Sequence, residues 1–109
     1  MATTLKIVAG NTAPNWQITC ERDGVAINLN GCTVTVNIEN SDGVITRTGG
    51  VCTILNSAAG IISYLPTAGD CPEEDTYSID VKVTYGDLTY EVLYEQLKVK
   101  TREPIIPVV

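Results

Sequence analysis

Apolar and polar residues alternate along most of this chain, and this alternation restricts its fold more than any other feature of the sequence. The clearest run has apolar residues at the odd positions from Tyr77 to Tyr85 and polar residues at the even positions between them. Successive side chains of a β-strand point to opposite faces, so this run predicts a strand with one face in the core and one in solvent. No long stretch keeps its apolar residues at helical spacing. The chain is therefore predicted to be all-β.

Turn signals divide the alternating runs into about eight or nine short strands, which is typical of a β-sandwich of antiparallel sheets. Asp23-Gly24 predicts a tight hairpin, and Gly49-Gly50 predicts a turn between two strands. A polar loop is expected over residues 66–75. The strands are predicted at residues 5–9, 16–21, 25–29, 32–38, 44–47, 51–55, 61–65, 77–85 and 88–99. A closed barrel is the main alternative.

The last of these predicted strands changes its phase. Its apolar residues occupy even positions up to Tyr94 and odd positions from Leu97 onward. An extra residue on one strand produces such a slip. We therefore expect a β-bulge near Glu95-Gln96, or a crossing of the strand between the two sheets.

The length of 109 residues suits one domain and leaves no room for a second core. Apolar residues make up 44% of the chain and charged residues 18%, a balance that excludes intrinsic disorder. We expect a sandwich domain over residues 1–100 and an extended, proline-containing arm over residues 101–109. The arm supplies the predicted assembly interface, which consists of Pro104, Ile105, Ile106, Pro107, Val108 and Val109. A final edge strand and a frayed terminus are the alternatives for this segment.

The net charge of −6 repels phosphate backbones and anionic lipids, so nucleic acid and membrane surfaces are not expected partners. The first ten residues contain neither a secretory signal nor an apolar stretch that spans a membrane. Synthesis in a cytoplasm is therefore expected, with the thiols initially reduced.

The chain contains no histidine, which removes the commonest general base and the commonest metal ligand. None of its serines lies in a G-x-S-x-G elbow, and no glycine-rich loop leads into Gly-Lys-Ser/Thr. No catalytic residue, cofactor site or metal site is predicted, and the chain is not expected to be an enzyme. A carboxylate pair facing across a cleft is the enzymatic alternative.

The most acidic stretch contains Asp70, Glu73, Glu74 and Asp75. Several carboxylates in one loop suit Ca²⁺, but their spacing differs from that of an EF-hand. We expect a solvated loop instead, because exposed carboxylates are common on protein surfaces.

The four cysteines, Cys20, Cys32, Cys52 and Cys71, include no C-x-x-C pair, which excludes a zinc ribbon. The first three lie on the apolar side of alternating runs. We expect inert, buried thiols rather than disulfides, because nothing in the sequence directs the chain to an oxidising compartment.

Five tyrosines accompany one tryptophan and no phenylalanine, and Tyr77, Tyr85, Tyr90 and Tyr94 lie late in the chain. We expect their rings to be buried with the hydroxyl groups at the rim of the sandwich. The alternative is an exposed tyrosine platform on which a sugar ring or a partner protein stacks.

Four segments stand in an order and spacing that is similar to a known family. They are GNTAPNW at residues 10–16, DGVAINLNGCTV at 23–34, GIISY at 60–64 and TYSIDVKVTY at 76–85. Over residues 8–99 the chain resembles the immunoglobulin-like N-terminal domain of phage baseplate upper proteins. The resemblance implies an immunoglobulin-like β-sandwich.

The resemblance also implies a non-enzymatic structural protein of a bacteriophage virion, placed in the baseplate, in the tail or neck, or at a fibre anchor. The implied partners are other virion structural proteins and copies of the chain itself. Because closed rings are the usual form of such assemblies, we expect a trimer or hexamer. The implied location is the virion. The alternatives are a capsid decoration or cement protein and a carbohydrate- or receptor-binding sandwich module.

Overall fold

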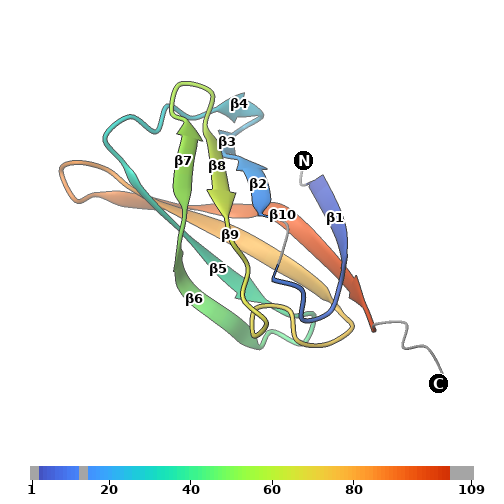
Figure 1. Cartoon of the computed structure of the whole chain (residues 1–109). Helices are drawn as coiled ribbons and strands as arrows, with labels where there is room; N and C mark the ends of the chain where they lie inside the picture. Colours follow the sequence, from blue (N-terminus) through green and yellow to red (C-terminus); the bar gives the residue numbers. More distant parts are fainter. Residues whose placement is uncertain (1–2, 13–14, 104–109) are drawn as a thin grey trace, which may run out of the picture.

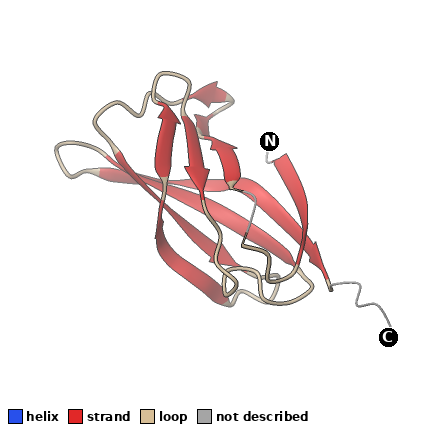
Figure 2. Ribbon diagram, viewed as in Figure 1, coloured by secondary structure: helices blue, strands red, loops and turns tan. Residues whose placement is uncertain are grey.

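The computed structural model describes residues 3–12 and 15–103, which form ten strands and no helix (Figures 1 and 2). These residues accordingly include no helix of the length and apolar character needed to cross a membrane. The all-β prediction is confirmed. The strands are β1 (Thr3–Val8), β2 (Trp16–Thr19), β3 (Glu21–Arg22), β4 (Val25–Ala26), β5 (Thr33–Glu39), β6 (Ile45–Val51), β7 (Thr53–Asn56), β8 (Ile61–Tyr64), β9 (Thr76–Thr84) and β10 (Tyr90–Arg102).

The strands build a β-sandwich of two unequal sheets. The larger sheet has the order β1-β10-β9-β5-β6, the smaller has the order β2-β8-β7, and β3 and β4 form a separate hairpin. Figure 1 shows the smaller sheet crossing one face of the larger sheet. Every pairing is antiparallel except the pairing of β1 with β10 at one edge. The predicted sandwich is therefore confirmed, with one parallel pair at its edge.

The core lies between the sheets and follows the alternation of the sequence. Its largest fully buried side chains are Trp16, Ile18, Leu29, Val34, Val36, Ile38, Ile62, Tyr77, Ile79, Val81, Val83 and Val99. Those of β5 and β9 occupy alternate positions, as predicted. Trp16 of β2 packs against Tyr64 of β8 with ring centroids 5.6 Å apart, so aromatic side chains fill one end of the smaller sheet's inner surface.

The Asp23-Gly24 hairpin is confirmed, because both residues have a positive φ and the flanking strands β3 and β4 pair. The predicted turn at Gly49-Gly50 is wrong, since both residues lie within β6. Gly49 has a φ of +67° and donates its N–H to the side chain of Asn37, at an irregularity in the β5–β6 pairing. Gly50 leaves room for the ring of Tyr64, whose Cε1 would lie 2.7 Å from an added Cβ.

The predicted bulge in the last strand is confirmed, because the register of β10 with β9 shifts between Leu93 and Leu97. The prediction that the late tyrosines are buried is wrong for two of them. The side chains of Tyr90 and Tyr94 are 62% and 80% exposed, whereas Leu93 in the opposite phase is buried. The first half of β10 therefore turns its tyrosines away from the core.

The last strand continues into the segment expected to form the arm, because β10 ends at Arg102. Thr101 is buried, and its hydroxyl donates to the carbonyl of Glu73 at 2.6 Å and accepts the N–H of Asp75 at 2.9 Å. Thr101 therefore ties the end of β10 to the loop before β9. The predicted interface residues 104–109 lie outside the described part of the chain.

Candidate functional site

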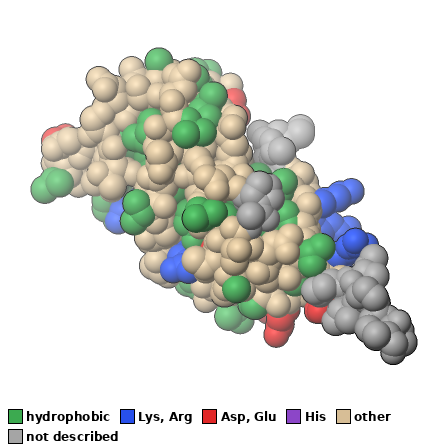
Figure 3. All heavy atoms as spheres, viewed as in Figure 1, with side chains coloured by type: hydrophobic (Ala, Val, Ile, Leu, Met, Phe, Trp, Pro, Cys, Tyr) green, Lys and Arg blue, Asp and Glu red, His purple; other side chains and the backbone are tan. Residues whose placement is uncertain are grey.

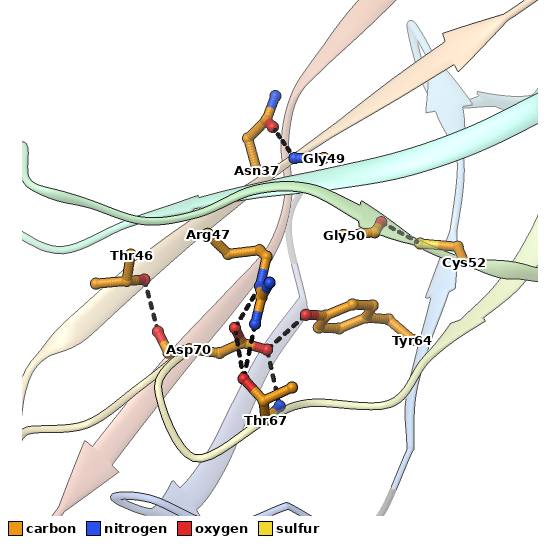
Figure 4. A network of polar contacts seen from close by, with 9 residues as sticks. All are labelled: Asn37, Thr46, Arg47, Gly49, Gly50, Cys52, Tyr64, Thr67 and Asp70. Atoms are coloured by element: carbon orange, nitrogen blue, oxygen red, sulfur yellow. Dashed lines mark hydrogen bonds and ion pairs between the residues drawn. The ribbon is translucent and has the colours of Figure 1, made fainter.

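Asp70 is the one buried carboxylate among the described residues, and it lies in the loop between β8 and β9. Its Oδ1 accepts hydrogen bonds from Arg47 Nε at 2.7 Å and from the Thr67 hydroxyl at 3.1 Å. Its Oδ2 accepts from the Tyr64 hydroxyl at 2.5 Å and from the Thr67 N–H at 2.9 Å (Figure 4). The Thr46 hydroxyl donates to the backbone carbonyl of Asp70 at 2.6 Å. These bonds fasten the loop to β6.

The hydrogen bonds at Asp70 also decide its charge. Burial disfavours the charged carboxylate, but the bonds from Tyr64, the Thr67 N–H and Arg47 outweigh burial and lower the pKa of Asp70 below its usual value. A carboxylate with four donors has no lone pair left for a substrate proton or a metal ion. The Asp70 cluster is therefore a structural clasp rather than a catalytic site. The expectation that the acidic stretch is solvated is wrong for Asp70.

The other acids of this stretch do not form a shared binding site with Asp70. The Asp75 carboxylate accepts bonds from the Ser41 hydroxyl at 2.6 Å and the Thr76 N–H at 2.7 Å, which lower its pKa. Within residues 3–12 and 15–103, no group of three or more His, Cys, Asp or Glu side chains is arranged to bind a metal ion.

A cleft of about 570 Å³ separates β2 and the β3–β4 hairpin from the bulged part of β10. Glu21 and Asp23 line its hairpin wall, and Glu95 lies on the β10 wall. The Glu95 carboxylate is bonded to Ser78 at 3.4 Å and to Lys98 at 3.2 Å, on the side of β10 that faces away from the smaller sheet. Because Ser78 and Lys98 already engage the Glu95 carboxylate, it is not free for the acid–base role that a carboxylate mechanism requires.

The hairpin is held on β10 by a second polar cluster. The Glu91 carboxylate is bonded to the guanidinium of Arg22 and to the hydroxyl of Tyr85. Arg22 Nη2 also donates to the Tyr85 hydroxyl at 3.2 Å. Exposed ion pairs of this kind contribute little stability, so the cluster mainly orients the hairpin.

All four cysteines are free thiols, and Cys20 and Cys71 are buried. Burial raises the pKa of Cys20 to about 11 and the pKa values of Cys52 and Cys71 to about 12. A thiol must lose its proton to act as a nucleophile, so these three are unreactive at neutral pH.

The larger sheet presents one face to solvent, and we call this face the outer face. Paired residues of a sheet point to the same side, so the strand register identifies its members. They are Thr4, Lys6 and Val8 on β1; Tyr90, Val92, Lys98, Lys100 and Arg102 on β10; Thr76, Ser78, Asp80, Lys82 and Thr84 on β9; Thr33, Thr35, Asn37 and Glu39 on β5; and Ile45 and Val51 on β6. Tyr94, which is 80% exposed, continues the alternation of Tyr90 and Val92 on β10 and belongs to the same face. No second layer of the described chain covers this face.

Large apolar side chains are exposed on the outer face, which is unusual for the open side of a sandwich. Tyr90, Val92 and Tyr94 follow one another along β10, and Ile45 and Val51 lie on the opposite edge strand β6. Single exposed apolar residues are ordinary, but neighbouring ones mark surfaces that contact a partner. The outer face is therefore the candidate functional site.

The β10 bulge places Tyr94 on this face. Glu95 follows it with a φ of +44°, a left-handed conformation that is unfavourable for a residue with a side chain. The Glu95 N–H donates to Oδ1 of Asp80 on β9 at 2.7 Å, which fixes the bulge. Strained backbone and bulges occur at functional sites, where they direct a side chain.

Tyr94 stands between two hollows. On one side it lines the 570 Å³ cleft, and on the other it forms a wall of a hollow of about 310 Å³ on the outer face. Residues from three other strands complete the smaller hollow. They are Asn37, Ile38, Glu39, Ile45, Thr48, Ser78 and Asp80. The hollow combines an aromatic wall with the carboxylates of Glu39 and Asp80.

Basic side chains gather at the end of the outer face. Lys6 pairs in register with Lys100, and Arg102 follows on β10. Figure 3 shows Lys and Arg side chains clustered beside the C-terminal end of the described chain. A net charge of −6 makes this concentration of cations on one face a distinct feature of the molecule.

The comparisons with known proteins provide no relative for this chain, because neither the protein-family models nor the curated proteins contain a match.

Proposed function

We propose that this chain is a non-enzymatic structural protein of a bacteriophage particle and acts by docking to other proteins. The similarity of four segments to the immunoglobulin-like domain of baseplate upper proteins supports this class of protein. The observation that carries the proposal is the outer face, where Tyr90, Val92 and Tyr94 are exposed in a row on a sheet without a covering layer. Aromatic residues in such positions are typical anchors of protein interfaces.

The polar clusters of the chain support a structural role over a catalytic one. The Asp70 carboxylate is saturated by donors, and Glu91 is occupied by Arg22 and Tyr85. Both clusters fasten a connecting segment to the larger sheet: the Asp70 cluster fastens the loop before β9 to β6, and the Glu91 cluster fastens the β3–β4 hairpin to β10. The residues 104–109 are proposed as a second contact element. Their removal should begin at Pro104, because Thr101 is part of β10.

Mass spectrometry of purified phage particles tests this proposal. In particles of the phage whose genome encodes the chain, we expect the chain in a fixed number of copies that matches a ring of three or six subunits or a multiple of it. A second sample, washed at high salt, should retain the chain because assembled interfaces also bury apolar surface. Absence of the chain from washed particles contradicts the proposal.

A carbohydrate- or receptor-binding module is the second candidate function, and the exposure of Tyr90 and Tyr94 favours it. An exposed aromatic ring beside polar side chains suits the face and hydroxyl groups of a sugar. A glycan-array screen distinguishes this candidate. Binding by the isolated wild-type chain, lost on Tyr94→Ala, supports the module, while absence of glycan binding favours protein docking.

A further inference from the structure

We propose that the outer face pairs with the outer face of a second copy of this chain, with Arg102 of each copy entering the hollow beside Tyr94 of the other. This inference rests on the proposed function, which it narrows to one partner and one contact.

The hollow has the chemistry that a guanidinium group requires. Asp80 uses Oδ1 to accept the Glu95 N–H, and no described residue bonds its second oxygen. Neither Asp80 nor Glu39 forms a salt bridge with a residue in the described part of the chain. The ring of Tyr94 forms the wall beside these carboxylates. Carboxylates accept hydrogen bonds from arginine, and an aromatic face attracts its positive charge.

The neighbouring tyrosine on the same strand already binds a cation in this way. Lys82 Nζ lies 4.4 Å from the centroid of the Tyr90 ring. Tyr94 has no corresponding cation from within residues 3–12 and 15–103. Within the described residues, the Tyr90 ring therefore carries a cation and the Tyr94 ring does not, so Tyr94 is the ring that can accept a cation from a partner.

The chain itself carries suitable cations. Of its seven Lys and Arg residues, four have partners in the described structure: Arg22, Arg47 and Lys98 form ion pairs, and Lys82 contacts Tyr90. The other three, Lys6, Lys100 and Arg102, form no ion pair with a described residue, and the register places them on the outer face. Unpaired carboxylates and unpaired cations on one face make that face complementary to a copy of itself.

The register selects Arg102 as the residue that meets Tyr94. Both lie on β10 and point to the outer face, about 25 Å apart at ~3.3 Å per residue. A two-fold axis that crosses β10 midway between them, near Lys98, superposes Arg102 of each copy on Tyr94 of the other. Planar guanidinium groups stack on aromatic rings better than ammonium groups do, which favours arginine in the hollow.

Because of this two-fold axis, one pair of copies fills both hollows, and neither hollow is left to bind a third copy. The product is a dimer. A separate three-fold contact, such as one made by residues 104–109, would combine three dimers into a hexamer. The pairing is therefore compatible with the hexamer that is one of the two expected assemblies.

Sedimentation velocity over a series of protein concentrations at low salt tests the pairing. We expect wild type to form dimers and Tyr94→Ala to weaken dimerisation about 30-fold, as truncation of an anchor residue does. Leu55→Ala is the control, since it removes an exposed apolar side chain from β7 of the smaller sheet, away from the outer face. Its effect should be below about 3-fold. Far-ultraviolet circular dichroism and thermal melting check that each variant folds.

A mixing experiment tests the identity of the contact. Arg102→Glu places a carboxylate against the acids of the hollow, and Glu39→Lys places a cation against Arg102, so each variant alone should be monomeric. An equimolar mixture should recover dimers, because both of its contacts then pair opposite charges. High salt should weaken the wild-type dimer.

Three outcomes overturn the inference: wild type that stays monomeric at every concentration, equal losses for Leu55→Ala and Tyr94→Ala, or a mixture that fails to dimerise. A monomeric wild type that binds a glycan through Tyr94 overturns it in favour of the second candidate function. The proposed function has a separate readout. If the chain is monomeric but present in particles, the inference fails and the proposed function stands. If the chain forms the dimer but is absent from particles, the proposed function fails and the pairing stands.

Discussion

Replacing Asp70 by alanine lowers the free energy of unfolding by about 3–5 kcal/mol, because several donors around a buried carboxylate lose their acceptor together. The substitution leaves the Tyr64 hydroxyl and the Thr67 N–H without their acceptor and leaves Arg47 without its counter-charge. Natural domains have a total stability of about 5–15 kcal/mol, so the loss is a large part of it. Urea unfolding followed by tryptophan fluorescence measures the change, since Trp16 lies in the core.

Asp87→Ala is the control for this substitution. Asp87 is exposed, and its carboxylate is bonded only locally, to the hydroxyl and N–H of Thr89, in the turn before β10. Removal of the Asp87 carboxylate should lower the free energy of unfolding by about 1 kcal/mol or less. Equal effects of the two substitutions would show that the buried clasp has no special role.

The pH dependence of stability provides an independent measure of the Asp70 clasp. Because the pKa of Asp70 is lowered in the folded chain, the unfolded chain takes up the proton first as the solution is acidified. The stabilisation is complete above the unfolded pKa of about 4 and is lost as the pH falls through the lower folded value. The difference in stability between wild type and Asp70→Asn should therefore shrink in acid. A difference that is constant from neutral pH into strong acid contradicts this account.

Replacing Gly60 by alanine lowers the free energy of unfolding by about 3 kcal/mol or more, because two costs combine. Gly60 has a φ of +69°, which a residue with a side chain adopts only under strain. An added Cβ would also lie 2.8 Å from the carbonyl oxygens of Cys20 and Ile27. Both clashing atoms belong to the backbone and cannot rotate away.

Gly43→Ala separates these two costs. Gly43 has a φ of +80°, and nothing lies within 4 Å of the position of an added Cβ. This substitution should cost only the backbone strain, about 1–2 kcal/mol. Thermal unfolding of both variants measures the difference. If the two variants melt at the same temperature, the close approach at Gly60 is not a constraint on the fold.

The elements with a purely local cause were predictable from the sequence. The alternation of β9 identifies a strand with one buried face, and the structure confirms it at Tyr77 through Val83. Asp23-Gly24 tolerates the positive φ values of its hairpin. The change of phase before Leu97 predicted the bulge because one extra residue must shift every later side chain to the other face.

The orientation of the first half of β10 was not predictable in the same way. Tyr90, Val92 and Tyr94 form the more apolar set, yet the set containing Glu91 and Leu93 faces the core side. Glu91 can lie on the core side because two residues distant in sequence, Arg22 and Tyr85, bond to its carboxylate. Alternation identifies the two faces of a strand, but the neighbours in the fold decide which face is buried.

The Asp70 clasp escaped prediction for a similar reason. Its main ion pair joins residues 23 positions apart, and its aspartate lies in a stretch that also contains the exposed Glu73 and Glu74. The Gly49-Gly50 pair was assigned to a turn because glycines usually mark turns. In the fold, Gly50 makes space for the ring of Tyr64, which is a tertiary contact without a local signal.

Cryo-electron microscopy of the phage particle tests the central claim most directly, because it shows what lies against the outer face. We expect density of a neighbouring subunit on the strip of Tyr90, Val92 and Tyr94 in every copy of the chain. A particle in which this strip faces solvent in all copies, or in which the chain is absent, contradicts the claim.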